Sequence, residues 1–399
     1  MRNSIWILAF STLISSAGIS LLVSALAIKV FYSSASALHA SAVYIAQLVP
    51  GIVFLPVVLH LCNMYSKKMG LVMAELLAAI LTLALGMLIE DAVLFNVCLL
   101  LAVRGVFELM TKTLRSSAVK AYSSCCSIAL SNNLVMGFNF LGQMVGGLVG
   151  FLLISHVQLF EIAIINAVAH ILSAIILLLL SSERASDRVS SLYESQAIKY
   201  GFQVLQRKFS LRFDFIYLVL VVVIFQAYNQ VARTWIVLEW LGLGLNFGFL
   251  GEIVGSLGIA GGLLLATIMA KKAYNKIIRA PIVVALAAVL IGFPFFAKSS
   301  VLVLIYYFAY MVAFEFSLMV CLNGVLRACP KEAVASVMGI FYGFSFALMA
   351  VMTMLIAVMA DMYGLPVVAF LITLFVLIAA LVGCRYPRLD SKRRRKYIV

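Results

Sequence analysis

The chain has 399 residues, of which 65% are hydrophobic and only 11% are charged. An ordinary soluble domain is about 45–50% apolar and about 25% charged. The composition therefore excludes a soluble globular fold and indicates a chain that uses the lipid bilayer as its solvent. The net charge of +14 would suit a nucleic-acid partner, but its distribution along the chain indicates a membrane topology instead.

Apolar runs long enough to span a bilayer, about 20 residues each, recur along the whole chain. The first, from Ile5 to Val30, is longer than the hydrophobic region of a signal peptide, which is about 7–15 residues, and predicts a first transmembrane helix. The expected segments are 4–31, 40–62, 70–89, 93–116, 128–154 and 157–181, followed by 213–237, 246–270, 280–297, 300–326, 334–360 and 363–384.

This pattern predicts an all-α integral membrane protein with twelve transmembrane helices in two pseudo-symmetric bundles of six. Residues 1–181 form the N-terminal bundle and residues 213–384 form the C-terminal bundle. Between them, residues 182–212 are polar and charged and are expected to be a cytoplasmic linker that carries a short amphipathic helix. Residues 385–399 are expected to be a basic cytoplasmic tail.

The positive charges set the orientation of these segments. All but four of the 29 Lys and Arg residues are assigned to one side of the membrane. The exceptions are Lys29 and Lys298, on the other side, and Arg104 and Arg233, within segments. Because cytoplasmic loops carry an excess of Lys and Arg, both termini are expected in the cytoplasm and no nucleic-acid partner is expected.

The fourth and fifth segments combine charges with glycines. Arg104 and Glu108 lie deep in the fourth segment, where a charge is costly and usually faces a bundle interior or a water-filled cavity. The fifth carries glycines at a spacing of about four residues, which allow helix backbones to approach closely. The two segments predict a polar cavity walled by tightly packed helices. The glycines are Gly142, Gly146, Gly147 and Gly150.

The two halves show weak internal similarity around an acidic residue. Phe107-Glu108 and Phe314-Glu315 each stand sixteenth in their segments, and Lys120 and Arg327 follow twelve residues after the two glutamates. A shared order of this kind is typical of transporters built from related halves with a substrate site near the midplane. Glu315 could exchange a proton or bind a cationic substrate, and a structural carboxylate is the alternative.

The seventh segment contains the most polar stretch within any segment. Its side chains could line the substrate site or seal an outer gate, and Glu252 or Glu239 could pair with its arginine. Tyr310 in the tenth segment could stack on a substrate, although aromatic packing is the default. His170 is interpreted as a structural histidine. The residues of the polar stretch are Gln226, Tyr228, Asn229, Gln230 and Arg233.

No catalytic or cofactor-binding signature is present in the sequence. There is no GxxxxGK[ST] phosphate-binding loop, no HExxH and no nucleophile elbow, and none of the seven cysteines forms a CxxC pair. We therefore expect neither an enzyme nor a protein with a metal or organic cofactor. Uphill transport would have to use an ion gradient.

In layout and motifs the chain resembles the major facilitator superfamily, and more narrowly its bacterial efflux branches. The family's loop motif GxLaDRxGRK is matched in part between the second and third segments. There Asn63 replaces the acidic residue, and Lys67 and Lys68 supply the cations of the gating loop. The helix-4 motif, an arginine four residues after a leucine, fits Leu100 and Arg104.

The family's exporter motif GxxxGPxxGG in helix 5 fits the glycines of the fifth segment. Gly142, Gly146 and Gly150 match, Gly147 stands in place of the proline, and Phe151 stands in place of the last glycine. The resemblance implies that helices 1, 4, 7 and 10 line a central cavity and that Arg104 takes part in proton coupling. It also places Glu75 and His170 in peripheral helices, the third and the sixth. It also implies a monomeric, multi-pass protein of the bacterial inner membrane, surrounded by membrane lipids.

The expected function is proton-coupled efflux of a small organic compound, such as a drug, a siderophore or a peptide-like antibiotic. In this hypothesis Glu108 and Glu315 exchange protons and Arg104 tunes them. Helix 1 has no acidic residue, although many proton-coupled relatives carry one there, so a uniporter or a small-metabolite importer stays open. A lysolipid flippase-like facilitator, with Arg104 or Arg233 on the head group, and a non-transporting membrane receptor are further alternatives.

Overall fold

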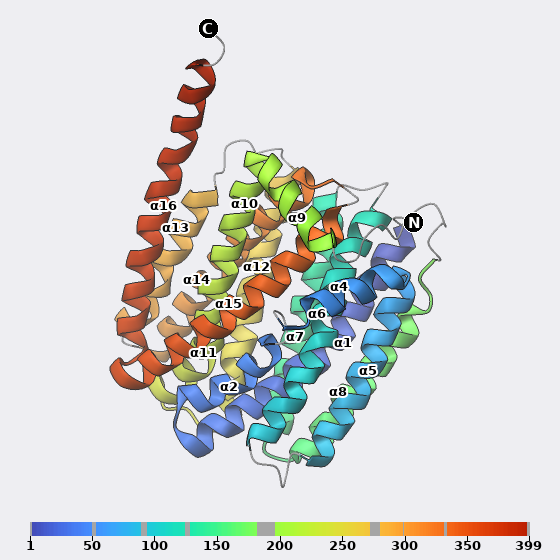
Figure 1. Cartoon of the computed structure of the whole chain (residues 1–399). Coiled ribbons are helices and arrows are strands. Elements are labelled where there is room, and N and C mark those ends of the chain that lie inside the picture. The colour runs from blue at the N-terminus through green and yellow to red at the C-terminus, as the bar shows by residue number, and fades with distance from the viewer. Residues whose placement is uncertain are drawn as a thin grey trace.

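A computed structural model describes residues 2–49, 53–88, 94–123, 128–181, 196–271, 280–297, 299–330 and 333–396. Every regular element in these ranges is helical, and the helices form one elongated bundle (Figure 1). Nine of the described helices are long and apolar enough to cross a membrane, and two shorter stretches are also apolar. The all-α membrane architecture expected from the sequence is therefore confirmed.

The described part of the N-terminal half contains five long helices and two short ones, α2 and α4. Its helices are α1 (Arg2–Ser34), α2 (Ala37–Leu48), α4 (Leu55–Met64), α5 (Lys67–Leu88), α6 (Leu94–Tyr122), α7 (Ile128–Leu153) and α8 (Leu159–Leu177).

The C-terminal half follows after a short connecting helix, α9 (Gln196–Arg207), which lies where the sequence predicts an amphipathic helix. Its remaining helices are α10 (Phe209–Leu220), α11 (Ala227–Trp235), α12 (Leu250–Lys271), α13 (Ala280–Ile291), α14 (Ser300–Ala328), α15 (Val334–Tyr363) and α16 (Leu365–Lys396).

Two of the expected segments differ from the prediction in their helical structure. The segment expected at 40–62 contains two described helices, α2 and α4, and Pro56 stands in the first turn of α4, where its missing N–H removes no helical hydrogen bond. The last apolar span ends at Cys384, as expected, and helix α16 continues from it through the basic tail to Lys396, because Lys and Arg are good helix formers. This part of α16 projects from the end of the bundle (Figure 1).

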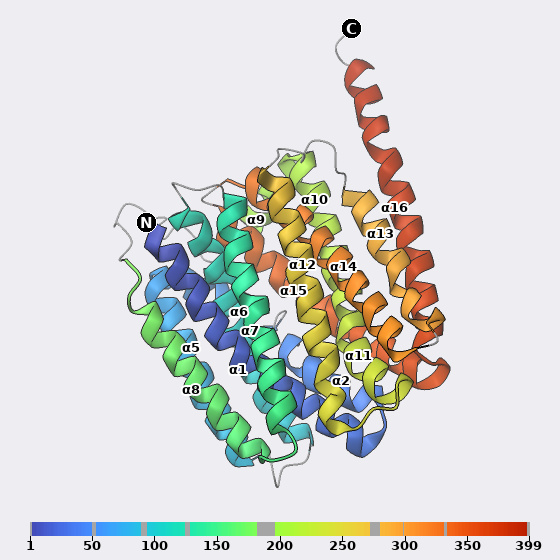
Figure 2. The ribbon, with the colours of Figure 1, turned by 180° about the vertical axis from the view of Figure 1, so that it is seen from behind.

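The first and last helices place both chain termini at the same end of the bundle (Figures 1 and 2). We call it the terminus end and the opposite one the far end. The turns between α1 and α2 and between α7 and α8 lie at the far end (Figure 1). The terminus end is the one that the sequence assigns to the cytoplasm.

Close backbone contacts hold α7 against α1. A Cβ atom added to Gly142 would lie 2.3 Å from the carbonyl oxygen of Leu13, and one added to Gly146 would lie 2.3 Å from that of Ala17. Only glycine permits such an approach, and small residues play this part between membrane helices. The contact brings the polar side chains of α1 toward the centre of the bundle.

The two halves contact each other through two pairs of helices. On one face α7 of the N-terminal half runs beside α12 of the C-terminal half (Figure 2), where Gly147 faces Ile253. On the opposite face α2 lies against α15, and Asp361 bonds to the start of α2. The region between these two helix pairs is the centre of the molecule.

Candidate functional site

A cavity of about 290 Å³ lies between the two halves. Its lining comes from both halves and includes four cationic side chains, Arg104, Lys112, Arg115 and Arg233, and four carboxylates. The carboxylates are Glu75, Glu108, Glu252 and Glu315, and the neutral polar lining residues include Thr12, Ser15, Ser16, Ser20, Ser24, Asn132, Asn139, Gln143, Gln226, Asn229 and Gln230.

Most of the charge in the N-terminal half comes from α6, which carries Arg104, Glu108, Lys112 and Arg115 on its cavity side. These residues are spaced three or four apart, so they share one face of the helix. A charge within a membrane segment is tolerated where it faces a cavity or a partner. The cavity and its polar lining supply that environment for α6.

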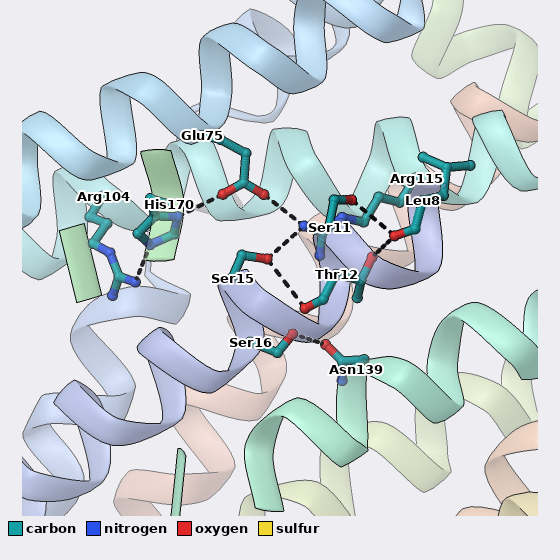
Figure 3. Close-up of polar contacts among 10 residues, drawn as sticks. All are labelled: Leu8, Ser11, Thr12, Ser15, Ser16, Glu75, Arg104, Arg115, Asn139 and His170. Carbon is teal, nitrogen blue, oxygen red and sulfur yellow. Dashed lines mark hydrogen bonds and ion pairs between the residues drawn. The ribbon is translucent and has the colours of Figure 1, made fainter. Parts of the chain in front are cut away.

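A chain of hydrogen bonds crosses the N-terminal half from α6 through α8 and α5 to α1 (Figure 3). Nη2 of Arg104 lies 3.1 Å from Nε2 of His170, and Nδ1 of His170 lies 2.6 Å from Oε2 of Glu75. The other oxygen of Glu75 accepts from Nη2 of Arg115 at 2.7 Å, and the same Nη2 donates to Ser15 at 2.8 Å. We call these five residues the α6–α8–α5–α1 chain.

The imidazole of His170 stands between a guanidinium and a carboxylate. An arginine can only donate, so the contact of Arg104 with Nε2 suits the tautomer in which Nδ1 carries the proton and donates to Glu75. The carboxylate of Glu75 is paired with Arg115, while Arg104 contacts the imidazole.

Glu108 pairs with a cation of its own helix. Its Oε1 lies 2.7 Å from Nζ of Lys112, one turn further along α6. Arg104, four residues before Glu108, bonds to His170. Arg104 and Glu108 thus belong to two separate interactions.

A second cluster lies toward the far end of the cavity and joins the two halves. Arg233 pairs with Glu252, as the sequence suggested, and its guanidinium carbon stands 4.2 Å from the centre of the Tyr44 ring in α2. Glu252 accepts hydrogen bonds from Ser20 at 3.0 Å and from Ser24 at 3.3 Å, both in α1. An ion pair of the C-terminal half is thereby tied to two helices of the N-terminal half.

Glu315, in the middle of α14, has a contrasting environment. Its side chain lines the cavity and is 0% exposed, and neither carboxyl oxygen has a hydrogen-bond partner. Burying an unpaired carboxylate is costly, so this group is stable when it holds a proton or faces a cation. It is the one cavity carboxyl in the described chain with both oxygens unpartnered.

The polar stretch of the seventh segment is divided between the cavity and the protein interior. Gln226 and Asn229 line the cavity, and Gln226 belongs to a π-helical turn, Val221–Gln226, a feature that is frequent at functional sites. Tyr228 and Tyr310, expected to line it, are packed in the core outside the lining. Their rings contact each other at a centroid distance of 5.7 Å, so aromatic packing is the outcome there.

The residues of the two family motifs, in the loop between the second and third segments and in α7, are not members of the cavity ion pairs. Gly147 stands 3.3 Å from a side-chain carbon of Glu252, measured from its would-be Cβ atom, and Gly150 stands against Phe249. Of the gating-loop residues, Lys68 donates to the carbonyl of Leu180 at 3.0 Å. Lys67 begins α5, and the side chain of Asn63 is outside the described part of the chain.

The sequence analysis did not identify four of the charged or titratable side chains that line the cavity. Glu75 and His170 were expected to be peripheral but line the cavity, and Lys112 and Arg115 were assigned to the inner surface. One available signal is the run of hydroxyl residues in α1 at a spacing of four, which marks a polar helix face. It consists of Thr12, Ser16, Ser20 and Ser24.

No group of three or more His, Cys, Asp or Glu side chains that could hold a metal ion occurs in the part of the chain that the structure describes. The five cysteines in that part form no disulfide.

The comparisons with known proteins agree with this architecture. The chain superposes on the nucleoside transporter NupG with a TM-score of 0.69 at 14% identity, covering 96% of this chain and 98% of that one. It superposes on the fucose:proton symporter FucP of E. coli with a TM-score of 0.67 at 14% identity, covering 96% and 98%.

A third similar structure is a bacterial homolog of the human lysosomal transporter Spinster, in an inward-facing and unoccupied conformation. Its TM-score is 0.69 at 11% identity, with 96% of each chain covered. Likeness at such identities shows the fold. A search of curated protein sequences gave no match.

The sequence model of the Major Facilitator Superfamily matches residues 8–352, which is most of the 399-residue chain. The matched region includes both halves and all eight charged residues of the cavity. Members of this family are transporters and not enzymes. The chain belongs to the Major Facilitator Superfamily and has the fold of a multi-pass membrane transporter.

Proposed function

We propose that this protein is a proton-coupled exporter of a small organic compound, which it binds in the central cavity. The observation that carries the proposal is the isolation of Glu315, a fully buried cavity carboxyl whose two oxygens have no partner. The proposal places the protein in a bacterial inner membrane as a monomer, with the terminus end in the cytoplasm and lipid around its apolar surface.

Competition between a proton and the substrate for the carboxyl group of Glu315 would couple proton movement to substrate movement. A protonated carboxyl satisfies the buried site without a charge, and an ionised one requires a cation. A basic group on the substrate and a proton would therefore replace each other there. Such replacement, combined with rocking of one half against the other, gives exchange of substrate for protons.

The remaining charged residues would tune this exchange. Glu108 is the second candidate for a proton site, because its Oε2 has no hydrogen-bond partner, but Lys112 neutralises its other oxygen. Arg104 faces the same cavity and would favour the ionised state of any acidic group near it. We expect Glu315 to contribute most to coupling and Glu108 to contribute less.

The test requires a transported compound. Purified protein is first screened for thermal stabilisation, at acid and at neutral pH, against organic cations, siderophores and peptide antibiotics. A stabilising compound is then loaded into proteoliposomes, and its movement is followed with and without a pH gradient. We expect Glu315→Gln to abolish the response to the gradient while downhill movement persists.

A matched control is Glu161→Gln. Glu161 caps its own helix by accepting from the backbone N–H of Gln158 at 2.9 Å, and it lies outside the cavity lining. This variant should respond to the gradient like the parent protein. Unchanged gradient-driven movement in both Glu315→Gln and Glu108→Gln would show that the coupling assignment is wrong.

Import is the second candidate function, because the similar structures include a nucleoside transporter and a fucose:proton symporter. An acidic substrate held by Arg104 would travel with a proton, since its negative charge favours protonation of the buried carboxyl groups of Glu108 and Glu315. In the proteoliposome experiment an importer moves substrate in the direction of the proton gradient and an exporter moves it against that direction.

A lysolipid facilitator is the remaining alternative, and it would hold the head-group phosphate on Arg104, because Arg233 is already paired with Glu252. Translocation of a fluorescent lysolipid in the same proteoliposomes separates this activity from transport of a soluble compound.

A further inference from the structure

The charged side chains of the cavity form three ion pairs and leave two groups over. Arg115 pairs with Glu75 at 2.7 Å, Lys112 pairs with Glu108 at 2.7 Å, and Arg233 pairs with Glu252. Arg104 and Glu315 are the cavity cation and the cavity carboxyl that remain. They are not within ion-pair distance of each other or of another charged side chain in the described residues.

Arg104 is an incompletely satisfied cation. It is 2% exposed, it bonds through Nη2 to the imidazole of His170 and not to a carboxylate, and its Nε and Nη1 atoms have no hydrogen-bond partner. A buried guanidinium normally meets an acidic group with several of its N–H donors. The remaining donors of Arg104 therefore fit an oxyanion that the chain itself does not provide.

Glu315 is isolated because the C-terminal half lacks the cations that surround its counterpart. In the N-terminal half, Arg104 stands four residues before Glu108 and Lys112 stands four residues after it. The equivalent positions around Glu315 are Met311 and Met319. The same position in the two halves thus holds a neutralised carboxylate in one half and an unmatched carboxyl in the other.

We propose that the substrate is amphoteric, with an acidic oxyanion that binds Arg104 and a basic nitrogen that binds Glu315. This inference rests on the proposed transport function and gives it a substrate class. A substrate with both groups completes the charge of the cavity at its two unmatched positions. Its body would be apolar, because phenylalanines line the cavity around them, namely Phe107, Phe140, Phe314, Phe341 and Phe346.

The probes for the test are four forms of one scaffold. They are 4-(aminomethyl)benzoic acid, its carboxamide, its N-acetyl derivative and the doubly blocked compound. The same four forms of a longer biphenyl scaffold allow for the separation of the two sites. A phosphonate version of each acid distinguishes a phosphate-bearing substrate from a carboxylate-bearing one. Affinities are measured by isothermal titration with purified protein in nanodiscs at one fixed pH.

On at least one scaffold, the amphoteric form should bind at least about tenfold more tightly than either singly blocked form, since each block removes a charged hydrogen bond. Arg104→Gln should remove the advantage of the free acid and leave that of the free amine. Glu315→Gln should do the reverse. Because the blocked compounds are compared on the unaltered protein, a folding defect in a variant cannot produce the first result.

The proposal is overturned if no amphoteric form binds more tightly than its blocked counterparts, or if each variant weakens all four forms equally. These outcomes are separate from the fate of the transport function. Gradient-driven movement of a compound without an acidic group would overturn the substrate class and leave transport standing. Tighter binding of the amphoteric form, without transport of any compound, would support the substrate class and overturn the transport function.

Discussion

The carboxylate of Asp361, in the last turn of α15, accepts a hydrogen bond from the backbone N–H of Ala37, the first residue of α2, at 2.8 Å. Its other oxygen accepts from the N–H of Leu38 at 3.2 Å and from the hydroxyl of Ser36 at 2.9 Å. An acidic side chain of one half thus caps a helix of the other half, where the positive end of the helix dipole favours it.

We predict that Asp361→Ala weakens the contact between the two halves at the far end. A helix cap is worth about 1 kcal/mol, so the population open at this end should rise by about fivefold. The measurement is the distance between spin labels at His156 and Phe296, exposed positions of the two halves, in a cysteine-free background. The labels should show a larger long-distance component in the variant.

The control for this prediction is Glu161→Gln, which removes a helix-capping carboxylate that contacts only its own helix. Its distance distribution should match that of the parent. A long-distance component of equal size in both variants would mean that the Asp361 contact does not hold the halves together.

Lys120 makes the corresponding contact at the terminus end. Its Nζ donates to the carbonyl oxygens of Leu326 at 3.0 Å and of Cys329 at 2.5 Å, at the end of α14, where the helix dipole favours a cation. Lys120→Gln should open this end and raise the alkylation rate of the buried Cys329 by about tenfold, since a charged hydrogen bond contributes about 1.5–3 kcal/mol.

Lys68→Gln is the matched control for Lys120→Gln, with the other native cysteines replaced in both. Lys68 also donates to a backbone carbonyl, that of Leu180, three residues beyond the end of α8, but within the N-terminal half. Its removal should leave the alkylation of Cys329 unchanged. Equal labelling of Cys329 in the parent and in Lys120→Gln would contradict a closing role for this lysine.

The sequence was sufficient for the helical architecture and for part of the site. Glu252 was one of two partners proposed for Arg233, with Glu239 as the other, and the structure pairs Arg233 with Glu252. Gly142 and Gly146 were expected to bring helices together, and they lie against backbone carbonyls of α1. Such features depend on spacing within one or two helices, which the sequence displays directly.

Other parts of the site depend on which helices become neighbours. His170 and Glu75 belong to α8 and α5, and their direct contact requires the rotation of both helices about their axes. Lys112 and Arg115 were counted with the cations of the inner side, although they fall within the expected fourth segment, 93–116. The helix α6 continues to Tyr122, so these two cations lie deeper and line the cavity.

A double-mutant cycle would test the burial of the Glu75–Arg115 pair. Glu75→Gln leaves the charge of Arg115 without a carboxylate, and breaking a buried pair in this way costs about 3–5 kcal/mol. Arg115→Gln should cost a similar amount, and the double variant should cost clearly less than their sum. The measurement is thermal unfolding of the purified protein in detergent, followed by thiol-reactive fluorescence.

The partly solvent-facing pair of Lys112 and Glu108, with side chains 38% and 20% exposed, supplies the comparison. Lys112→Gln should destabilise the protein by about 1 kcal/mol or less, as exposed ion pairs do. Additive losses in the Glu75–Arg115 cycle would show that the two groups do not depend on each other.

The contact of α7 with α1 gives a prediction for a single methyl group. In Gly146→Ala the new Cβ would stand 2.3 Å from the carbonyl oxygen of Ala17 and 3.1 Å from the backbone N of Leu21. Backbone atoms cannot yield as a flexible side chain does, so the helices must separate. Overpacking of this kind costs about 1–3 kcal/mol, which thermal unfolding should detect.

Gly244→Ala is the control for Gly146→Ala. No atom lies within 4 Å of the Cβ position at Gly244, and its φ of −68° suits any residue. This variant should unfold at the parent temperature or slightly above it, because alanine restricts the unfolded chain more than glycine does. If Gly146→Ala were as stable as Gly244→Ala, the close approach of α7 to α1 would not be a feature of the folded protein, and the hydroxyl face of α1 would lose the contact that directs it into the cavity.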